Sequence, residues 1–127
     1  MTKENKDLLL KDLCARLPYG VKCKYYDCCE GDYDEGTICG FERQVFIQID
    51  GVCIHIEEVK PYLFPLSSMT EEKDKEFALL QTSAGQEGFL YIWNCANMMK
   101  WLIENHFDYN GLIEKGLAID ATGKNIY

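Results

Sequence analysis

The sequence lacks any long apolar run. No stretch of its 127 residues approaches the about 18 consecutive apolar residues that suggest a membrane-spanning helix. The charged opening, from Met1 to Asp7, leads into only a short leucine run, which is too short for the apolar core of a signal peptide. We therefore expect a cytoplasmic protein with no membrane partner.

Positive charge is also scarce. Thirteen Lys and Arg residues stand against 21 Asp and Glu residues, which gives a net charge of −8. Proteins that bind nucleic acid need clustered Lys and Arg to neutralise phosphates, so we do not expect direct nucleic-acid binding. The opposite interpretation, an acidic mimic of nucleic acid, requires the acids to line one face at the phosphate spacing of a duplex.

Motifs for phosphate, cofactor or metal binding are missing as well. The segment from Gly85 to Gly88 is not followed by the Lys-Ser or Lys-Thr of a phosphate-binding loop, and no CxxC pair occurs. The chain has only two histidines, His55 and His106. The sequence thus contains no recognisable catalytic motif, and no cofactor is predicted.

The apolar pattern predicts one α+β domain over residues 1–127. An N-terminal helix is expected to precede a small antiparallel sheet, or partial barrel, of about four to five strands, with further helices toward the C-terminus. The segment 60–66 contains two prolines and is not expected to be a central strand, and 27–36 is expected to be an acidic loop. Residues 89–93 fit a strand or a helix equally. The expected elements are helices over 5–16, 69–82 and 95–106 (the last with Asn94 as its N-cap), and strands over 21–26, 37–41, 45–49, 52–56 and 117–120.

The clearest local signal is a β-hairpin. Asp50-Gly51, a favoured two-residue turn, separates two apolar runs of alternating pattern. Such a turn pairs Ile49 with Val52 and Ile47 with Ile54, which places these apolar residues on one face. The other face then carries Gln48 opposite Cys53, and Phe46 opposite His55. Turn type and apolar pattern agree, which is typical of a correctly identified element.

Three stretches together resemble a family of small uncharacterised bacterial and phage-like proteins. These are Leu8–Val21 (LLLKDLCARLPYGV), Lys60–Thr70 (KPYLFPLSSMT) and the segment from Asn105 to Ile113 that begins Asn-His-Phe-Asp-Tyr. The cysteine-rich middle, from Cys23 to Phe41, does not match the family. The resemblance implies a prophage or mobile-element setting and no particular chemistry.

Seven cysteines in a chain expected to be cytoplasmic favour reduced thiols over a disulfide framework. Four of them, Cys23, Cys28, Cys29 and Cys39, are the candidate zinc ligands of a zinc-stabilised domain. Their spacing opposes that interpretation, because zinc ligands usually occur in short knuckles of two cysteines. Small, partly buried thiols are the alternative.

The only candidate catalytic pair is Cys53 with His55. On one strand they are two residues apart and share a face, and a cysteine nucleophile needs a base within hydrogen-bond reach. These two residues give the enzymatic hypothesis, a small cysteine-dependent enzyme.

Aromatic residues make up 13% of the chain, and we expect that a domain of this size cannot bury all of them in its core. A semi-exposed aromatic surface beside acidic residues is typical of a protein contact or a dimer seam. The alternative is that these are ordinary core aromatics whose polar tips reach the surface. We therefore predict a non-enzymatic protein-binding or adaptor module whose partner is another protein or a second copy. The candidate contact residues are Phe46, Tyr62, Phe64, Trp93, Asp32, Asp34 and Glu35.

Overall fold

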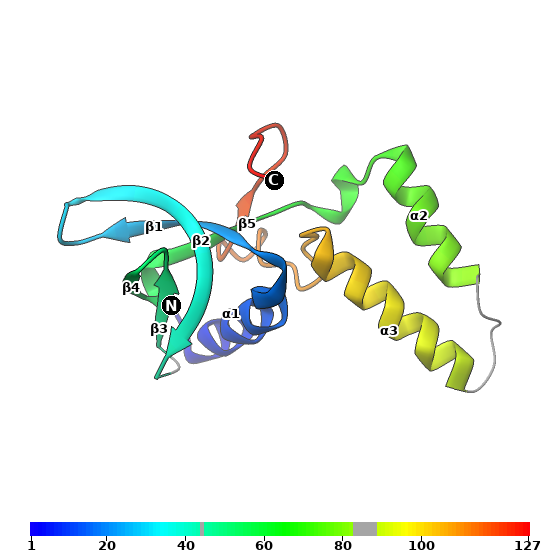
Figure 1. Cartoon of the computed structure of the whole chain (residues 1–127), viewed down its shortest axis with the longest axis horizontal. Coiled ribbons are helices and arrows are strands. Elements are labelled where there is room, and N and C mark those ends of the chain that lie inside the picture. The colour runs from blue at the N-terminus through cyan, green and yellow to red at the C-terminus, as the bar shows by residue number, and fades with distance from the viewer. Residues whose placement is uncertain (44, 83–88) are drawn as a thin grey trace.

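The computed structural model describes residues 1–43, 45–82 and 89–127 and has an α+β fold (Figure 1). A helix precedes six strands, and a pair of helices separates the fifth strand from the sixth. The helices are α1 (Lys3–Arg16), α2 (Glu71–Thr82) and α3 (Phe89–Glu104). The strands are β1 (Lys22–Asp27), β2 (Asp32–Glu42), β3 (Phe46–Ile49), β4 (Val52–His55), β5 (Val59–Leu63) and β6 (Ile119–Asp120). Short 3₁₀ turns are η1 (Leu17–Tyr19), η2 (Ile56–Glu58) and η3 (Leu66–Ser68).

The six strands form one open, mostly antiparallel sheet in the order β4-β3-β2-β1-β5-β6. Among the strand pairs that the structure describes, β5–β6 is the one parallel pair. Strand β2 bends strongly, as its arc in Figure 1 shows, so that its first half pairs with β1 and its second half with β3. The register shifts between Ile38 and Gly40, and this bulge marks the bend. The sheet therefore has more strands than the four to five expected.

The β3–β4 hairpin has the predicted register. Ile49 pairs with Val52, and Ile47 pairs with Ile54. Asp50 and Gly51 both have positive φ, of 46° and 88°, as the mirror-image turn requires. Ile47, Ile49 and Ile54 are at most 7% exposed, so this face of the hairpin belongs to the core.

Strand β2 corrects the expectation of an acidic loop over 27–36. It begins at Asp32, and its acidic first half pairs along β1 as far as Asp27. The rings of Tyr26 and Tyr33 meet edge to face with centroids 5.2 Å apart, and the Lys24 ammonium lies 5.1 Å from the centroid of the Tyr33 ring. These cross-strand contacts stabilise a strand whose own residues have low strand propensity.

Strand β5 corrects the expectation that the proline-containing segment is not a central strand. It lies between β1 and β6, with Pro61 opposite Cys23. Strand β6 pairs only with Tyr62 and Leu63. Pro61 therefore lies beyond the end of the β6 ladder, where its missing N–H removes no bond from that edge.

Helix α1 confirms the expected N-terminal helix and packs Leu9 and Leu13 into the core. Its inner face also carries a buried ion pair between Asp12 and Arg16, both at most 1% exposed. Arg16 donates to the Phe107 carbonyl, with 2.6 Å between Nη2 and O. This contact ties the first helix to the chain segment that follows α3.

Helix α3 settles the ambiguity at 89–93, since it begins at Phe89. Asn94 consequently lies inside the helix, so its prediction as an N-cap is wrong. The helix ends in a Schellman motif, in which Phe107 N donates to Leu102 O and His106 N donates to Ile103 O. His106 occupies the left-handed position, with φ of 62°, that glycine usually takes.

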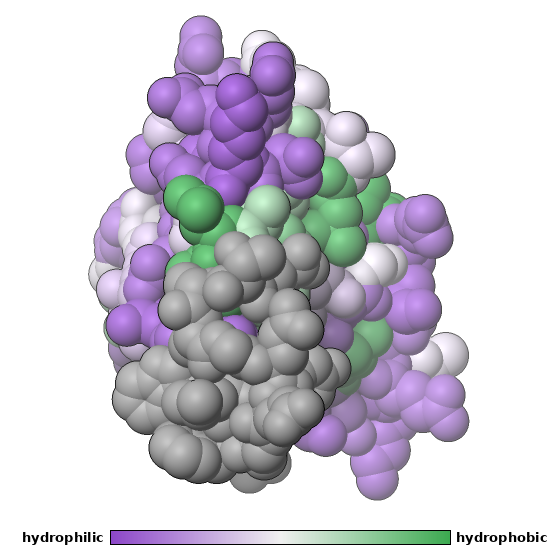
Figure 2. All heavy atoms as spheres, turned by 90° about the vertical axis from the view of Figure 1, so that its right-hand side faces the viewer, coloured by the Kyte–Doolittle hydropathy of each residue, from purple (hydrophilic) through white to green (hydrophobic). Residues whose placement is uncertain are grey.

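Helices α2 and α3 form a hairpin that stands away from the sheet (Figure 1). Figure 2 views the molecule from this side and shows apolar surface gathered in the middle of the face, with hydrophilic surface above it. Leu66, Leu79 and Met99, which belong to η3, α2 and α3, are 47%, 66% and 40% exposed.

Candidate functional site

The outer face of the β3–β4 hairpin is open to solvent. Phe46 is 37% exposed, Gln48 and Cys53 are exposed, and His55 is half-buried. The helices pack elsewhere, with α1 on the core and α2 and α3 on the far side of the molecule (Figure 1). The hairpin therefore presents one face to the core and the other to solvent.

A shallow hollow of about 350 Å³ lies on this outer face. It is lined by Cys39, Glu42, Gln48, Gly51, Val52 and Cys53. Cys39 Sγ lies 3.3 Å from the backbone oxygen of Gln48, to which it donates. The Cys53 thiol donates to Glu42 Oε2 over 3.1 Å. Two thiols from β2 and β4 thus open into one hollow, each with an oxygen as its acceptor.

The hydrogen bond to Glu42 raises the pKa of the Cys53 thiol, with partial desolvation and the carboxylate charge adding to the rise. A raised pKa keeps sulfur in its less nucleophilic thiol form. The expected partner, His55, is engaged elsewhere, since its Nδ1 accepts from Glu57 N over 3.2 Å and its ring meets Phe46 edge to face at 5.6 Å. This arrangement lacks the base-to-thiol contact that activates a cysteine nucleophile.

One edge of the sheet runs along β4, and the other along β6. In an antiparallel ladder the backbone bonds alternate between the two sides of a strand. Ile56 N donates to Val45 O, so the backbone groups of Ile54 and Val52 also point toward β3. The N–H and C=O of Cys53, and the N–H of His55, therefore point outward, away from β3. Within the described chain these outward groups of Cys53 have no backbone or side-chain partner.

The four candidate zinc ligands do not lie close enough together to share a metal ion. Cys23 is fully buried, and burial raises the pKa of its thiol to about 12. Cys28 and Cys29 lie exposed in the β1–β2 turn, and Cys39 lies on the outer face of the bend. Among the described residues, no three His, Cys, Asp or Glu side chains are grouped so as to hold a metal ion.

The candidate contact residues are separated by the fold. Tyr62 is only 4% exposed, and its hydroxyl donates to Glu35 Oε1 over 2.8 Å. The ring of Phe64 packs against those of Phe107 and Tyr127, with centroid distances of 6.1 and 5.9 Å. The side chain of Trp93 lies outside the described part of the structure. Phe46 therefore remains the one exposed aromatic of this set among the described side chains.

Acidic residues lie at opposite ends of the molecule. Asp32 and Asp34 are exposed on the β1–β2 hairpin, whereas Glu71 and Glu72 open α2 at the other end (Figure 1). A nucleic-acid mimic needs its acids along one face, and this distribution does not favour that interpretation.

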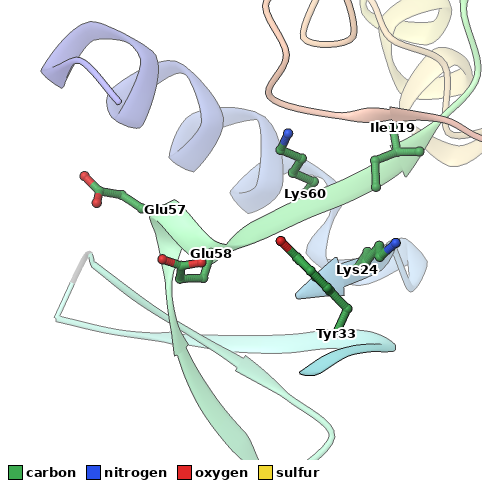
Figure 3. A pocket seen from close by; sticks show the side chains of 6 residues that line it. All are labelled: Lys24, Tyr33, Glu57, Glu58, Lys60 and Ile119. Atoms are coloured by element: carbon green, nitrogen blue, oxygen red, sulfur yellow. The ribbon is translucent and has the colours of Figure 1, made fainter. Parts of the chain in front are cut away.

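A second hollow, also of about 350 Å³, was not predicted from the sequence. It is lined by Lys24, Tyr33, Glu57, Glu58, Lys60 and Ile119 (Figure 3). Lys24 and Lys60 lie directly opposite each other on β1 and β5. The sequence pattern could not have paired them, because it did not identify β5 as a strand.

No helix in the described ranges has the length and apolarity to span a membrane. Comparison of the chain with protein-family models, with curated proteins and with solved structures finds no match.

Proposed function

We propose that this protein is a non-enzymatic protein-binding module that receives a short extended segment of a partner along β4. The observation that carries the proposal is the outward N–H and C=O of Cys53, on a strand with an open edge. Strand addition of this kind uses backbone hydrogen bonds for affinity and neighbouring side-chain pockets for specificity.

The composition of β4 supports this role. Edge strands commonly carry Lys, Pro or a bulge that discourages pairing with another chain. The four residues of β4, Val-Cys-Ile-His, include none of these, and the register shift lies in β2 instead. The short length limits the partner to a short segment, and the hollow beside Cys53 is placed to receive one of its side chains.

Charge favours a different protein over a second copy of this chain. Two copies with a net charge of −8 each repel one another, whereas a neutral or basic segment does not. A cytoplasmic adaptor in a prophage or mobile-element setting, as the sequence resemblance implies, is part of the same proposal.

A proline substitution tests the proposal. Because the Cys53 N–H points away from β3, Cys53→Pro keeps the β3–β4 ladder and removes a donor from the open edge. Displayed random peptides selected on the wild-type protein are expected to bind Cys53→Val, the matched control that keeps the N–H. They are expected to lose binding to Cys53→Pro. Peptides that bind both variants equally would show that β4 is not the docking edge.

A further inference from the structure

Two lysines face each other across β1 and β5, and one of them, Lys24, also lies opposite Glu35 on β2. Lys24 pairs with Lys60 in the antiparallel register, so their Cβ atoms are about 5 Å apart on one face. Like charges in this position destabilise a sheet. In the described part of the chain neither ammonium forms an ion pair. A bound anion would relieve the repulsion between these two ammonium groups.

The two lysines border the hollow in Figure 3, beside an exposed aromatic ring. Tyr33 is 63% exposed. The Lys24 ammonium lies over its ring, 5.1 Å from the centroid, and the Tyr26 ring meets it edge to face with centroids 5.2 Å apart. The rest of the Tyr33 ring is open to a flat ligand group, and stacking on such a ring is a common way to hold a base.

Two carboxylates, those of Glu57 and Glu58, line the hollow. Glu57 turns toward α1 (Figure 3), where its Oε1 lies 2.6 Å from Lys6 Nζ, and this pairing lowers the pKa of Glu57. Glu58 lies beside the two lysines without an ion pair, and Glu35, opposite Lys24 on β2, accepts a hydrogen bond from the Tyr62 hydroxyl. The hollow has a volume of about 350 Å³, which is at the small end for ligand sites, whose usual range begins at about 300 Å³.

We propose that the hollow between Lys24, Lys60 and Tyr33 binds a small phosphate monoester that carries a flat ring, of the size of a nucleoside monophosphate. The two ammonium groups hold the phosphate, and the Tyr33 ring stacks on the flat group. This site is separate from the β4 edge and does not depend on the protein-binding proposal.

The test is a titration of ¹⁵N-labelled protein followed by amide chemical shifts, at low salt, with adenosine 5′-monophosphate, inorganic phosphate and adenosine in separate arms. We expect saturable shifts around Lys24, Tyr33 and Lys60, with the monophosphate binding more tightly than phosphate or adenosine. Lys24→Met and Lys60→Met should each weaken binding by about threefold, as expected for one exposed charge contact. Lys11→Met, at an exposed lysine of α1, is the matched control and should have no effect.

Two further variants separate the parts of the site. Glu58→Gln should tighten binding of both phosphate ligands, since it removes the remaining unpaired carboxylate. Tyr33→Leu should abolish the advantage of the monophosphate over inorganic phosphate. The proposal is overturned if no saturable shifts occur at these residues, or if Lys24→Met and Lys60→Met bind as the wild type does while their spectra remain well dispersed.

Discussion

The thiol of Cys53 donates a hydrogen bond to Glu42 across two strands, from β4 to β2, with 3.1 Å between Sγ and Oε2. This contact replaces the Cys53–His55 pair that the shared strand face suggested. His55 instead accepts from the backbone at the start of η2. The outer face of the hairpin is therefore built to hold a protonated thiol beside a carboxylate.

The first prediction concerns the reactivity of that thiol. Because Glu42 raises the pKa of Cys53, Glu42→Gln should lower it and speed alkylation at pH 8 by severalfold. Site-resolved mass spectrometry after timed iodoacetamide labelling measures this rate, and Glu58→Gln is the control carboxylate. Faster labelling of Cys53 in the wild type than in Glu42→Gln would contradict the assignment.

The second prediction concerns the buried pair of Asp12 and Arg16. Asp12→Ala leaves the guanidinium buried without its counter-ion, so it should lower the free energy of unfolding by about 3–5 kcal/mol. The double variant Asp12→Leu/Arg16→Met should be less destabilised than the single one, because no uncompensated charge remains. Urea unfolding followed by circular dichroism gives both values. A single variant as stable as the wild type would show that the pair is not essential to the core.

The third prediction is a pH dependence from His106. Burial, with Arg16 and Lys22 nearby, lowers the pKa of His106 from 6.5 to about 4. The unfolded chain therefore binds a proton at higher pH than the folded chain, and this part of the stability is lost as pH falls from about 6.5 toward 4. His106→Asn keeps a residue that tolerates the left-handed conformation but does not titrate. Between pH 7 and pH 4 the wild type should lose more stability than this variant, as measured by thermal unfolding; parallel curves would contradict the prediction.

The fourth prediction uses the facing lysines as a stability test. Lys60→Glu converts a like-charge pair into an opposite-charge pair across β1 and β5, so it should raise stability by about 0.2–1 kcal/mol in the absence of ligand. Lys11→Glu, on the exposed side of α1, serves as the control for a change in net charge alone. Urea unfolding at low and high salt compares them, and the gain should shrink as salt screens the pair. Loss of stability in Lys60→Glu at low salt would count against the register.

The sequence predicted the parts of the fold in which two local signals agree. The hairpin at Asp50-Gly51 is such a case, since its turn residues and its alternating Ile positions require the same register. Strand β5 was missed because a proline is tolerated there only if it lies beyond the short ladder to β6. The position of Pro61 relative to β6 depends on the tertiary structure and is not visible in the sequence. The acidic start of β2 was missed for a similar reason, because Tyr33 gains its support from Tyr26 and Lys24 on the neighbouring strand.

The candidate site was predicted only in part. Sequence reasoning identified Phe46, Cys53 and His55 as neighbours on the outer face of the hairpin, and the register confirms that placement. It missed Glu42, whose approach to Cys53 depends on the bend in β2. It also missed the Lys24–Lys60 pair, since a cross-strand pair becomes visible only when both strands and their register are known.

The most direct measurement of the central claim is amide hydrogen exchange at β4 with and without a selected peptide. We expect the amides of Cys53 and His55 to exchange fast in the free protein, while the Ile54 amide is protected by its bond to β3. A bound peptide should then slow exchange at Cys53 and His55. Protection of the Cys53 amide in the free protein, or unchanged fast exchange at both amides in the complex, would contradict the claim that β4 is an open docking edge.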